Sequence, residues 1–190
     1  MKITAGVDEV GRGSLMGPVY AAAVILNSSI DIKLLKDSKS IAKDKRELLS
    51  NYIKKNSTWA VGKASVKEID KINILQASLL AMKRAVKKLK IKPSHILIDG
   101  NKVPDLKNYN LKAVIKGDQK IPSISAASII AKVSRDKFIS TLAKNYKGYG
   151  WDQNFGYGTK QHLTAIKKLG INKHHRKTFS PISRLKTHNI

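Results

Sequence analysis

The chain has 190 residues, 42% of them hydrophobic, which suffices for one domain with a buried core. Its 37 Lys and Arg outnumber its 13 Asp and Glu, and a net charge of +24 favours polyanionic partners, nucleic acid above all. Cysteine is absent, which excludes disulfides, thiolate metal sites and cysteine nucleophiles, so any metal must bind oxygen or histidine.

The N-terminal residues lack the pattern of a secretion signal. Asp8 and Glu9 stand where such a signal needs an apolar segment. The most apolar run, Val19 to Leu26, is far shorter than the roughly 20 residues of a membrane helix. No repeat or Pro/Gly/Ser-rich linker divides the chain. We therefore expect a cytoplasmic protein, not associated with a membrane, that forms a single domain over residues 1–190.

Three short segments near the N-terminus predict strands. They are rich in β-branched, small or aromatic residues and cover residues 3–7, 19–26 and 59–66. The first two can pair as a hairpin. Between the second and the third, Ser40 is expected to cap a helix that runs to about Lys55.

The middle of the chain alternates between helix and strand. Apolar residues recur at steps of three and four from Ile72 to Leu89, with lysines on the other face, which predicts an amphipathic helix. Ile96 to Asp99 then predicts a buried strand that ends in a carboxylate, and Lys112 to Ile115 predicts another. We expect both to be central, parallel strands.

Helices dominate the C-terminal part. A helix is predicted from Ser125 to Ala143, and the many Ala and Ser residues in its first half permit close approach to a neighbouring element. Thr159 and Gly170 frame a last helix as its N-cap and its C-terminal stop. The order of elements predicts an α/β fold, a sheet with helices packed on it.

Several of the few acids lie at the ends of predicted strands, namely Asp8, Glu9, Asp99 and Asp118. In open α/β sheets, side chains from neighbouring strands converge beyond the carboxyl ends, where ligands bind. Crowded carboxylates raise one another's pKa unless a cation compensates, and oxygen ligands favour Mg²⁺ or Mn²⁺. Two such ions roughly 4 Å apart provide the common chemistry of nucleases. The acids therefore predict a phosphodiester-cleaving metal site.

Each acid taken alone also fits a structural role. An Asp at a strand end often forms a turn or caps a helix, and Asp99-Gly100-Asn101 is a generic turn sequence. Asp8 and Glu9 pose a further difficulty, because consecutive strand residues point to opposite faces. One of the two must then be turned by a bend near Gly11.

A glycine-rich loop, Gly11-Arg12-Gly13, follows the first two acids. Glycines let the backbone approach a ligand and expose its amides, while Arg12 offers several donors to a phosphate. These features suit a loop that reads sugar hydroxyls through main-chain groups. A flexible turn between two strands fits as well. A P-loop is excluded because the Gly-Lys-Ser/Thr ending is missing.

Aromatic residues gather among glycines near the C-terminus, at Tyr149, Trp151, Phe155 and Tyr157. Exposed rings there can stack on bases or sugars. Tyr149 and Trp151 also fit a small cluster that pins a loop. The adjacent pair His174 and His175 lacks further ligands nearby, which argues against zinc.

Several segments together resemble the ribonuclease HII family over almost the whole chain. They are GVDEVGRGSLMGPVYAAAVIL from Gly6, KDSK from Lys36, ILIDG from Ile96, VIKGDQKIPSISAASIIAKVSRD from Val114, YGWDQNFGYGT from Tyr149 and HHRKTF from His174. The resemblance implies a ribonuclease H-like mixed sheet of about five strands, with flanking helices and a helical C-terminal part. It also implies that residues 145–190 form a substrate-binding extension.

The resemblance further implies an activity. It is endonucleolytic hydrolysis of the RNA strand of RNA/DNA hybrids and cleavage 5′ of single ribonucleotides embedded in duplex DNA. A two-metal-ion mechanism with Mn²⁺ or Mg²⁺ would leave 3′-hydroxyl and 5′-phosphate ends. The related ribonuclease HIII carries an extra N-terminal substrate-binding domain, and because the first strand is predicted to start at about residue 3, we expect no such domain here. A monomer is expected.

By matching positions, the resemblance implies that the four catalytic, metal-binding acids are Asp8, Glu9, Asp99 and Asp118. Asp136 is the rival for the fourth place. In the family pattern, however, the aspartate of Lys-Gly-Asp takes that role, which leaves Asp136 with a local ion-pairing role.

The implied substrate contacts lie in three places. Gly11, Arg12 and Gly13 would sense the 2′-hydroxyl at the RNA-to-DNA junction, Tyr157 would stack on the deoxyribose beyond it, and Lys39 would contact a phosphate.

Two features depart from the family pattern. Ser14 replaces a frequent proline, so we expect a somewhat freer loop. Residues 183–190 lack the glutamine and paired aromatics of a sliding-clamp-binding peptide, which argues against direct clamp binding.

Two other functions compete with this one. A non-catalytic nucleic-acid-binding protein, such as a translation factor or a ribosomal component, explains the charge but not the placement of the acids. Another two-metal enzyme of the same fold, such as a DNA strand transferase or a ribonuclease HI-type enzyme, explains the acids. The Gly11-Arg12-Gly13 loop argues against it.

Overall fold

The computed structural model describes residues 3–35 and 42–185. Its strands form one five-stranded sheet in the order β3-β2-β1-β4-β5. They are β1 (Thr4–Val10), β2 (Val19–Leu26), β3 (Ser57–Ala64), β4 (His95–Asp99) and β5 (Asn110–Val114). The pairs β1–β2 and β2–β3 are antiparallel, whereas β4 runs parallel to both β1 and β5. The predicted mixed sheet of about five strands is confirmed.

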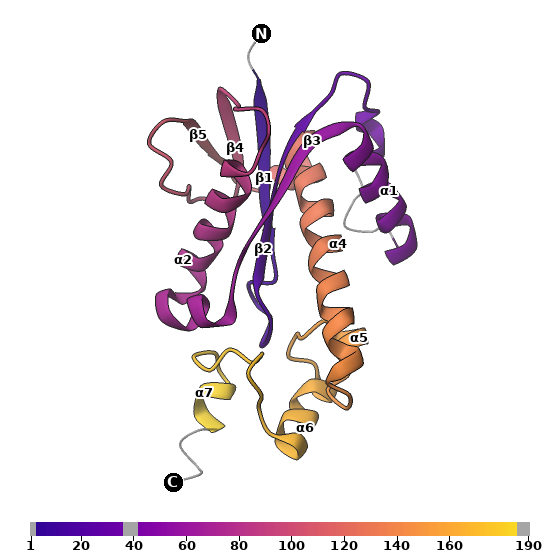
Figure 1. Cartoon of the computed structure of the whole chain (residues 1–190), viewed down its shortest axis with the longest axis vertical. Coiled ribbons are helices and arrows are strands. Elements are labelled where there is room, and N and C mark those ends of the chain that lie inside the picture. Colours follow the sequence, from indigo (N-terminus) through magenta and orange to yellow (C-terminus); the bar gives the residue numbers. More distant parts are fainter. Residues whose placement is uncertain (1–2, 36–41, 186–190) are drawn as a thin grey trace.

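Helices cover both faces of this sheet (Figure 1). They are η1 (Ile32–Leu35), α1 (Lys43–Lys55), α2 (Val66–Lys87), α3 (Gly117–Lys120), α4 (Pro122–Asn145), α5 (Trp151–Asn154), α6 (Lys160–Leu169) and α7 (Ile182–Leu185). The long helices α2 and α4 pack against the strands from opposite sides, and α5, α6 and α7 lie together beyond one end of the sheet (Figure 1).

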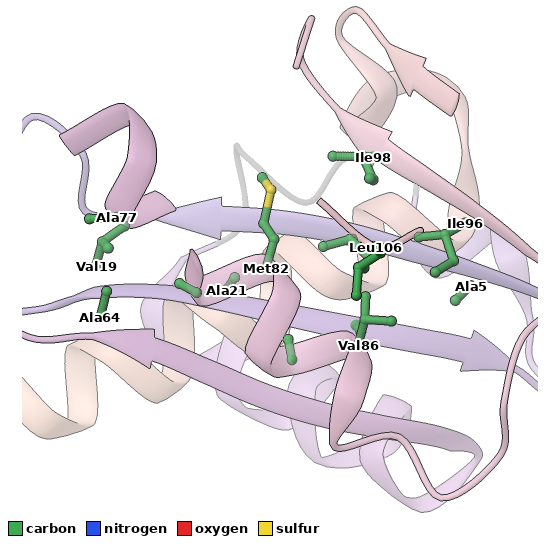
Figure 2. Packing of buried hydrophobic residues seen from close by; sticks show 14 of the residues in the cluster. Ala5, Val19, Ala21, Ala64, Ala77, Met82, Val86, Ile96, Ile98 and Leu106 are labelled. Atoms are coloured by element: carbon green, nitrogen blue, oxygen red, sulfur yellow. The ribbon is translucent and has the colours of Figure 1, made fainter. Parts of the chain in front are cut away.

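One core lies between the sheet and α2. Ala5 of β1 and Ile96 and Ile98 of β4 are buried in the same cluster as Met82 and Val86 of α2. Figure 2 shows these side chains meeting between the strands and the helix. This packing anchors the two parallel strands at whose ends the predicted acids stand.

The second core lies between the sheet and α4, and here the backbones come close together. A Cβ atom at Gly6 would overlap the backbone of Ser123 and Ile124, so only glycine lets α4 lie directly on β1. Ala126 and Ile130 of α4 are fully buried in this core. The predicted close approach of the Ala- and Ser-rich half of the helix is confirmed, and it places α4 alongside the acids of β1.

A third core holds the C-terminal elements against α4. Trp151 is fully buried and stacks on Tyr149, with ring centroids 4.8 Å apart. The cluster includes Ile139 of α4 and also Met16, which comes from the segment after β1. Tyr149 and Trp151 therefore pin a loop, one of the two roles that the sequence left open.

Two strand predictions were partly wrong. The first strand continues beyond Val7, because its pairing with β2 extends to the pair Val10 and Tyr20. Asp8 and Glu9 thus lie within β1 instead of closing it. The strand β5 is parallel as predicted but stands at the edge of the sheet, so only β4 is central.

The helix boundaries also differ from several predictions. The N-cap of α1 is Ala42, whose side chain makes no capping bond, so the prediction of Ser40 as the cap was wrong; Ser40 itself lies outside the described residues. The segment α2 begins at Val66, after a capping box of Ser65 and Glu68 that sequence reasoning missed. A kink at Asn73, with a φ of 64°, divides it, and the helix predicted from Ile72 corresponds to the part after the kink. Helix α4 begins three residues before the predicted Ser125, with proline in its first turn.

The last long helix follows its prediction. Thr159 is the N-cap of α6, and its side chain accepts a hydrogen bond from the His162 amide at 3.2 Å. Gly170 follows the helix with a φ of 75°, a conformation that favours glycine.

Candidate active site

A cavity of about 330 Å³ lies where β1 and β4 end, next to α3 and α4. All four predicted acids line it. The lining residues are Asp8, Glu9, Val10, Arg46, Asp99, Asp118, Ser128, Ile129 and Lys132. The structure thus brings together carboxylates from two strands and from the first turn of α3. Their role as metal ligands stays a prediction.

The register of β1 explains how both Asp8 and Glu9 line one cavity. Pairing between β1 and β4 stops at Val7 and Ile98, so Glu9 projects past the end of the neighbouring parallel strand. Asp8 lies on the α4 side of β1, where Ser128 gives it a hydrogen bond. The bend expected near Gly11 was wrong, since both acids belong to a regular strand.

Asp99 fixes the position of the next acid along the chain. Its Oδ1 accepts hydrogen bonds from the amides of Gly117 at 2.6 Å and Asp118 at 3.4 Å. Lys116, just before them, has a φ of 54°, and the turn that it makes leads directly into α3. The Asp99 carboxylate therefore has a structural role, because it accepts hydrogen bonds from the backbone amides at the start of α3. The same contacts hold Asp118 at the cavity wall.

Burial and mutual repulsion disfavour the charged forms of the first two acids. Burial raises the pKa of Asp8 well above its ordinary value, and the charges of Glu9 and Asp99 raise it further, against the hydrogen bond from Ser128. Burial also raises the pKa of Glu9, although the nearby Arg12 lowers it. A divalent cation would offset both effects, because it stabilises carboxylates in their charged form.

The carboxylates fit a hard cation by their chemistry, but not in their present rotamers. Across residues 3–35 and 42–185, no three His, Cys, Asp or Glu side chains are gathered closely enough to hold a metal ion. Local donors hold the carboxylates instead: the Glu9 amide is 2.7 Å from Asp8 Oδ1, and Arg12 is 3.2 Å from Glu9 Oε1. The fit to a metal ion is therefore one of ligand chemistry and not of the present side-chain geometry.

The two glycines of the Gly11-Arg12-Gly13 loop have different surroundings. Gly11 is buried with a φ of 91°, and a Cβ there would lie 2.7 Å from Arg135 Cδ. Gly13 is exposed, and a Cβ there would meet nothing within 4 Å. Gly11 is thus required by the fold, whereas Gly13 leaves space on the outer side of the loop.

Tyr157 lies close to the wall of the cavity. Its half-buried ring has its centroid 5.8 Å from the ammonium of Lys132, which lines the cavity, and 5.6 Å from the guanidinium of Arg135. Its backbone is held by a hydrogen bond to the Asn154 carbonyl at 2.9 Å. Tyr157 is not among the lining residues itself, but its ring is braced by α4 against one residue of the cavity wall.

The structure also clarifies three residues discussed from the sequence. Asp136 does not line the acidic cavity, and its Oδ1 is 3.0 Å from Lys132 Nζ, which confirms a local ion pair. Ser14 is fully buried, donates to the Met16 carbonyl at 3.0 Å and accepts from Arg135. Ser14 is thus tied into the fold, and its effect on the freedom of the loop relative to proline stays a prediction. Lys39 lies outside the described residues.

Sequence reasoning missed three residues of the cavity wall: Arg46, Ser128 and Lys132. Ser128 and Lys132 are four positions apart on α4, so they lie on the same face of the helix. That spacing was a usable signal, but only once the direction in which the helix faces was known.

Comparison with known proteins identifies the family. The sequence model of ribonuclease HII matches residues 5–182. A curated ribonuclease HII from Pelagibacter ubique is 78% identical over 185 residues, which are 97% of this chain and 100% of that protein. The chain belongs to the ribonuclease HII family. A member from Neisseria meningitidis serogroup B is 50% identical and covers 96% of this chain and 95% of its own length.

Solved structures agree with this assignment. The crystal structure of the ribonuclease H2 from Pyrococcus horikoshii superposes with a TM-score of 0.81 at 29% identity, covering 97% of each chain. The ribonuclease H-like fold is confirmed, and the relatives indicate a type 2 ribonuclease H, an endonuclease that acts on nucleic acid. Membership in a family of divalent-metal-dependent enzymes excludes the non-catalytic alternative. In the part of the chain that the structure describes, no helix is long and apolar enough to span a membrane.

Proposed function

We propose that this chain hydrolyses the RNA strand of RNA/DNA hybrids and cuts 5′ of single ribonucleotides embedded in duplex DNA, leaving 3′-hydroxyl and 5′-phosphate ends. The observation that carries the proposal is the cavity lined by Asp8, Glu9, Asp99 and Asp118 in a chain whose net charge is +24. Acids so placed in a basic protein suit the cleavage of a polyanion.

The four acids would hold Mg²⁺ or Mn²⁺. When bound, divalent ions supply Lewis-acid stabilisation of the charge that develops on a phosphodiester during hydrolysis by a two-metal-ion mechanism. Asp8 is held through its hydrogen bond with Ser128, and Asp118 is positioned because its backbone amide donates to the Asp99 carboxylate. Lys132, on the same wall, adds a positive charge that attracts the scissile phosphate.

Junction recognition would come from the loop and from Tyr157. The open space outside Gly13 lets the loop backbone lie against a ribose and sense its 2′-hydroxyl together with Gly11 and Arg12. The ring of Tyr157, which lies against Lys132 of the cavity wall, would stack on the deoxyribose beyond and disfavour a second 2′-hydroxyl there.

Two further substrate contacts belong to the proposal. Lys39 would contact a phosphate. Residues 145–190 would form a substrate-binding extension, in keeping with the position of Tyr157 within it and with the packing of these elements on the end of α4.

The test compares the wild type with Asp99→Asn and with the matched control Asp105→Asn. Asp105 is an exposed acid that pairs with Lys83 at 3.5 Å and lies outside the acidic cavity. We expect Asp99→Asn to bind duplexes but not to cut them, and Asp105→Asn to cut normally. An Asp99→Asn enzyme that cuts at the wild-type rate under saturating Mg²⁺ contradicts the assigned metal site.

A further inference from the structure

Two buried arginines lie beneath the Gly11-Arg12-Gly13 loop. Arg135 comes from α4, and Arg176 comes from the segment between α6 and α7; both are fully buried. Within residues 3–35 and 42–185, neither forms an ion pair with a carboxylate. Burying two guanidinium groups without a carboxylate partner is costly unless other acceptors satisfy their donors. The acceptors of their hydrogen bonds therefore indicate which parts of the fold the two arginines hold in place.

Arg176 directs its donors to the backbone of the loop. Its Nη2 donates to the Gly11 carbonyl at 2.6 Å, its Nη1 to the Arg12 carbonyl at 2.8 Å and its Nε to the Gly17 carbonyl at 3.0 Å. One planar fork therefore holds two residues of the loop and, four positions beyond it, Gly17 in a fixed geometry.

These bonds also fix the direction of the loop amides. In a trans peptide, the carbonyl of one residue and the amide N–H of the next point to opposite sides. Because Arg176 draws the carbonyls of Gly11 and Arg12 inward, the amides of Arg12 and Gly13 point away from it. A Cβ on Gly13 would meet nothing within 4 Å, so the space beside this residue is open to a ligand.

Arg135 connects this loop to the segment that carries Tyr157. Its Nη2 donates to Ser14 Oγ at 2.8 Å, and its Nη1 donates to the Phe155 carbonyl at 3.1 Å. Its guanidinium also lies 5.6 Å from the centroid of the Tyr157 ring. The distance between the loop and Tyr157 thus depends on Arg135, while the orientation of the loop amides depends on Arg176.

We propose that Arg176 is a positioning residue for sugar discrimination, which aims the amides of Arg12 and Gly13 at the ribose without touching the substrate. The inference rests on the proposed function, because it assumes that the loop reads a 2′-hydroxyl. It adds Arg176, a residue of the C-terminal segment, to the residues that determine which sugar is recognised.

A purely structural role for Arg176 would be to hold the C-terminal segment against the body of the protein. The structure offers a control for that role in Asp70 of α2. Its carboxylate accepts hydrogen bonds from the amides of Lys177 at 3.1 Å and Thr178 at 3.0 Å, and from the Thr178 hydroxyl at 2.8 Å. Asp70→Ala therefore removes the hydrogen bonds that hold the C-terminal segment at Lys177 and Thr178, but it leaves every bond between Arg176 and the loop in place.

The experiment uses the full chain as wild type, Arg176→Lys, Arg176→Gln and Asp70→Ala. Two quantities are measured: kcat and KM on a duplex with one ribonucleotide, and the ratio of affinities for that duplex and for the all-DNA duplex of the same sequence, in EDTA. Lysine keeps a positive charge at position 176 but not the fork, so Arg176→Lys reports on orientation if Arg176→Gln fails to fold.

We expect both Arg176 variants to lower kcat by about 10- to 100-fold, since a displacement of roughly 1 Å has effects of that order. The affinity ratio should fall toward 1, while Asp70→Ala should keep both quantities near the wild-type values. The inference is overturned if Arg176→Lys keeps the wild-type ratio and kcat, or if Asp70→Ala loses as much. A wild type without any preference for the ribonucleotide would overturn the proposed function itself.

Discussion

Replacing Gly13 by alanine separates substrate recognition from folding. The added methyl group would meet no protein atom within 4 Å, and Gly13 is not among the glycines with positive φ. We therefore expect the free energy of unfolding to change by no more than about 0.5 kcal/mol, as for other exposed substitutions. The same methyl group would stand where the loop backbone meets the ribose.

The expected loss is in activity alone. Displacing the sugar by roughly 1 Å from its reactive position can lower the rate of cleavage by about 100-fold. We therefore expect kcat/KM of Gly13→Ala to fall by about 10- to 100-fold. Gly11→Ala is the contrasting variant. Its φ of 91° and its contact with Arg135 predict a loss of about 1–2 kcal/mol from the backbone and about 1–3 kcal/mol from overpacking.

The assay combines urea unfolding with cleavage of a duplex that carries one ribonucleotide. The reasoning is refuted if Gly13→Ala cuts like the wild type. It is also refuted if Gly13→Ala loses activity only in proportion to the fraction unfolded, because the effect would then arise from the fold.

Four further predictions follow from single features of the structure. Tyr157→Ala should lose about 1–3 kcal/mol of transition-state stabilisation on a single embedded ribonucleotide and less on a continuous RNA/DNA hybrid; equal losses in kcat/KM would remove its junction role. Asp118→Asn should abolish cleavage at saturating Mg²⁺, whereas Asp136→Asn should keep most of it because Asp136 lies outside the cavity; the reverse result would exchange the two roles. Burial, with the charge of His162 next, lowers the pKa of the fully buried His175 to about 4, so the unfolded chain takes up a proton there first as the pH falls below about 6.5. As the pH falls from 6.5 to 4, the free energy of unfolding of the wild type should therefore fall by about 3 kcal/mol because of this histidine. The free energy of unfolding of His175→Asn should fall less over the same range, and identical pH profiles would refute this. Finally, the logarithm of duplex affinity should fall with the logarithm of salt concentration by about 0.9 per phosphate contact, and a flat response would show that the net charge does not serve binding.

Asp99 and Asp118 were predictable because the ends of their preceding strands are visible in the sequence. Asp99 follows a clear apolar run, and parallel strands bring their carboxyl ends to one edge, so its convergence with Asp118 follows from topology. The placement of Glu9 was not predictable. It depends on the pairing of β4 with β1 ending at Val7, and register between distant strands has no local signature.

The supporting residues were hidden for a different reason. Lys132 lines the cavity only because Gly6 allows α4 to pack directly on β1, a tertiary contact between distant segments. In a chain with 37 Lys and Arg, nothing in the sequence distinguishes the buried Arg135 and Arg176 from arginines on the surface. Their burial depends on loop carbonyls that are distant in the sequence.

Mapping the products from a duplex with one embedded ribonucleotide tests the central claim most directly. With Mg²⁺, the wild type should make one cut on the 5′ side of the ribonucleotide, leaving a 3′-hydroxyl and a 5′-phosphate, and Asp99→Asn should make none. Cleavage on the 3′ side, or no cleavage of this duplex by an enzyme that cuts a continuous RNA/DNA hybrid, would contradict it.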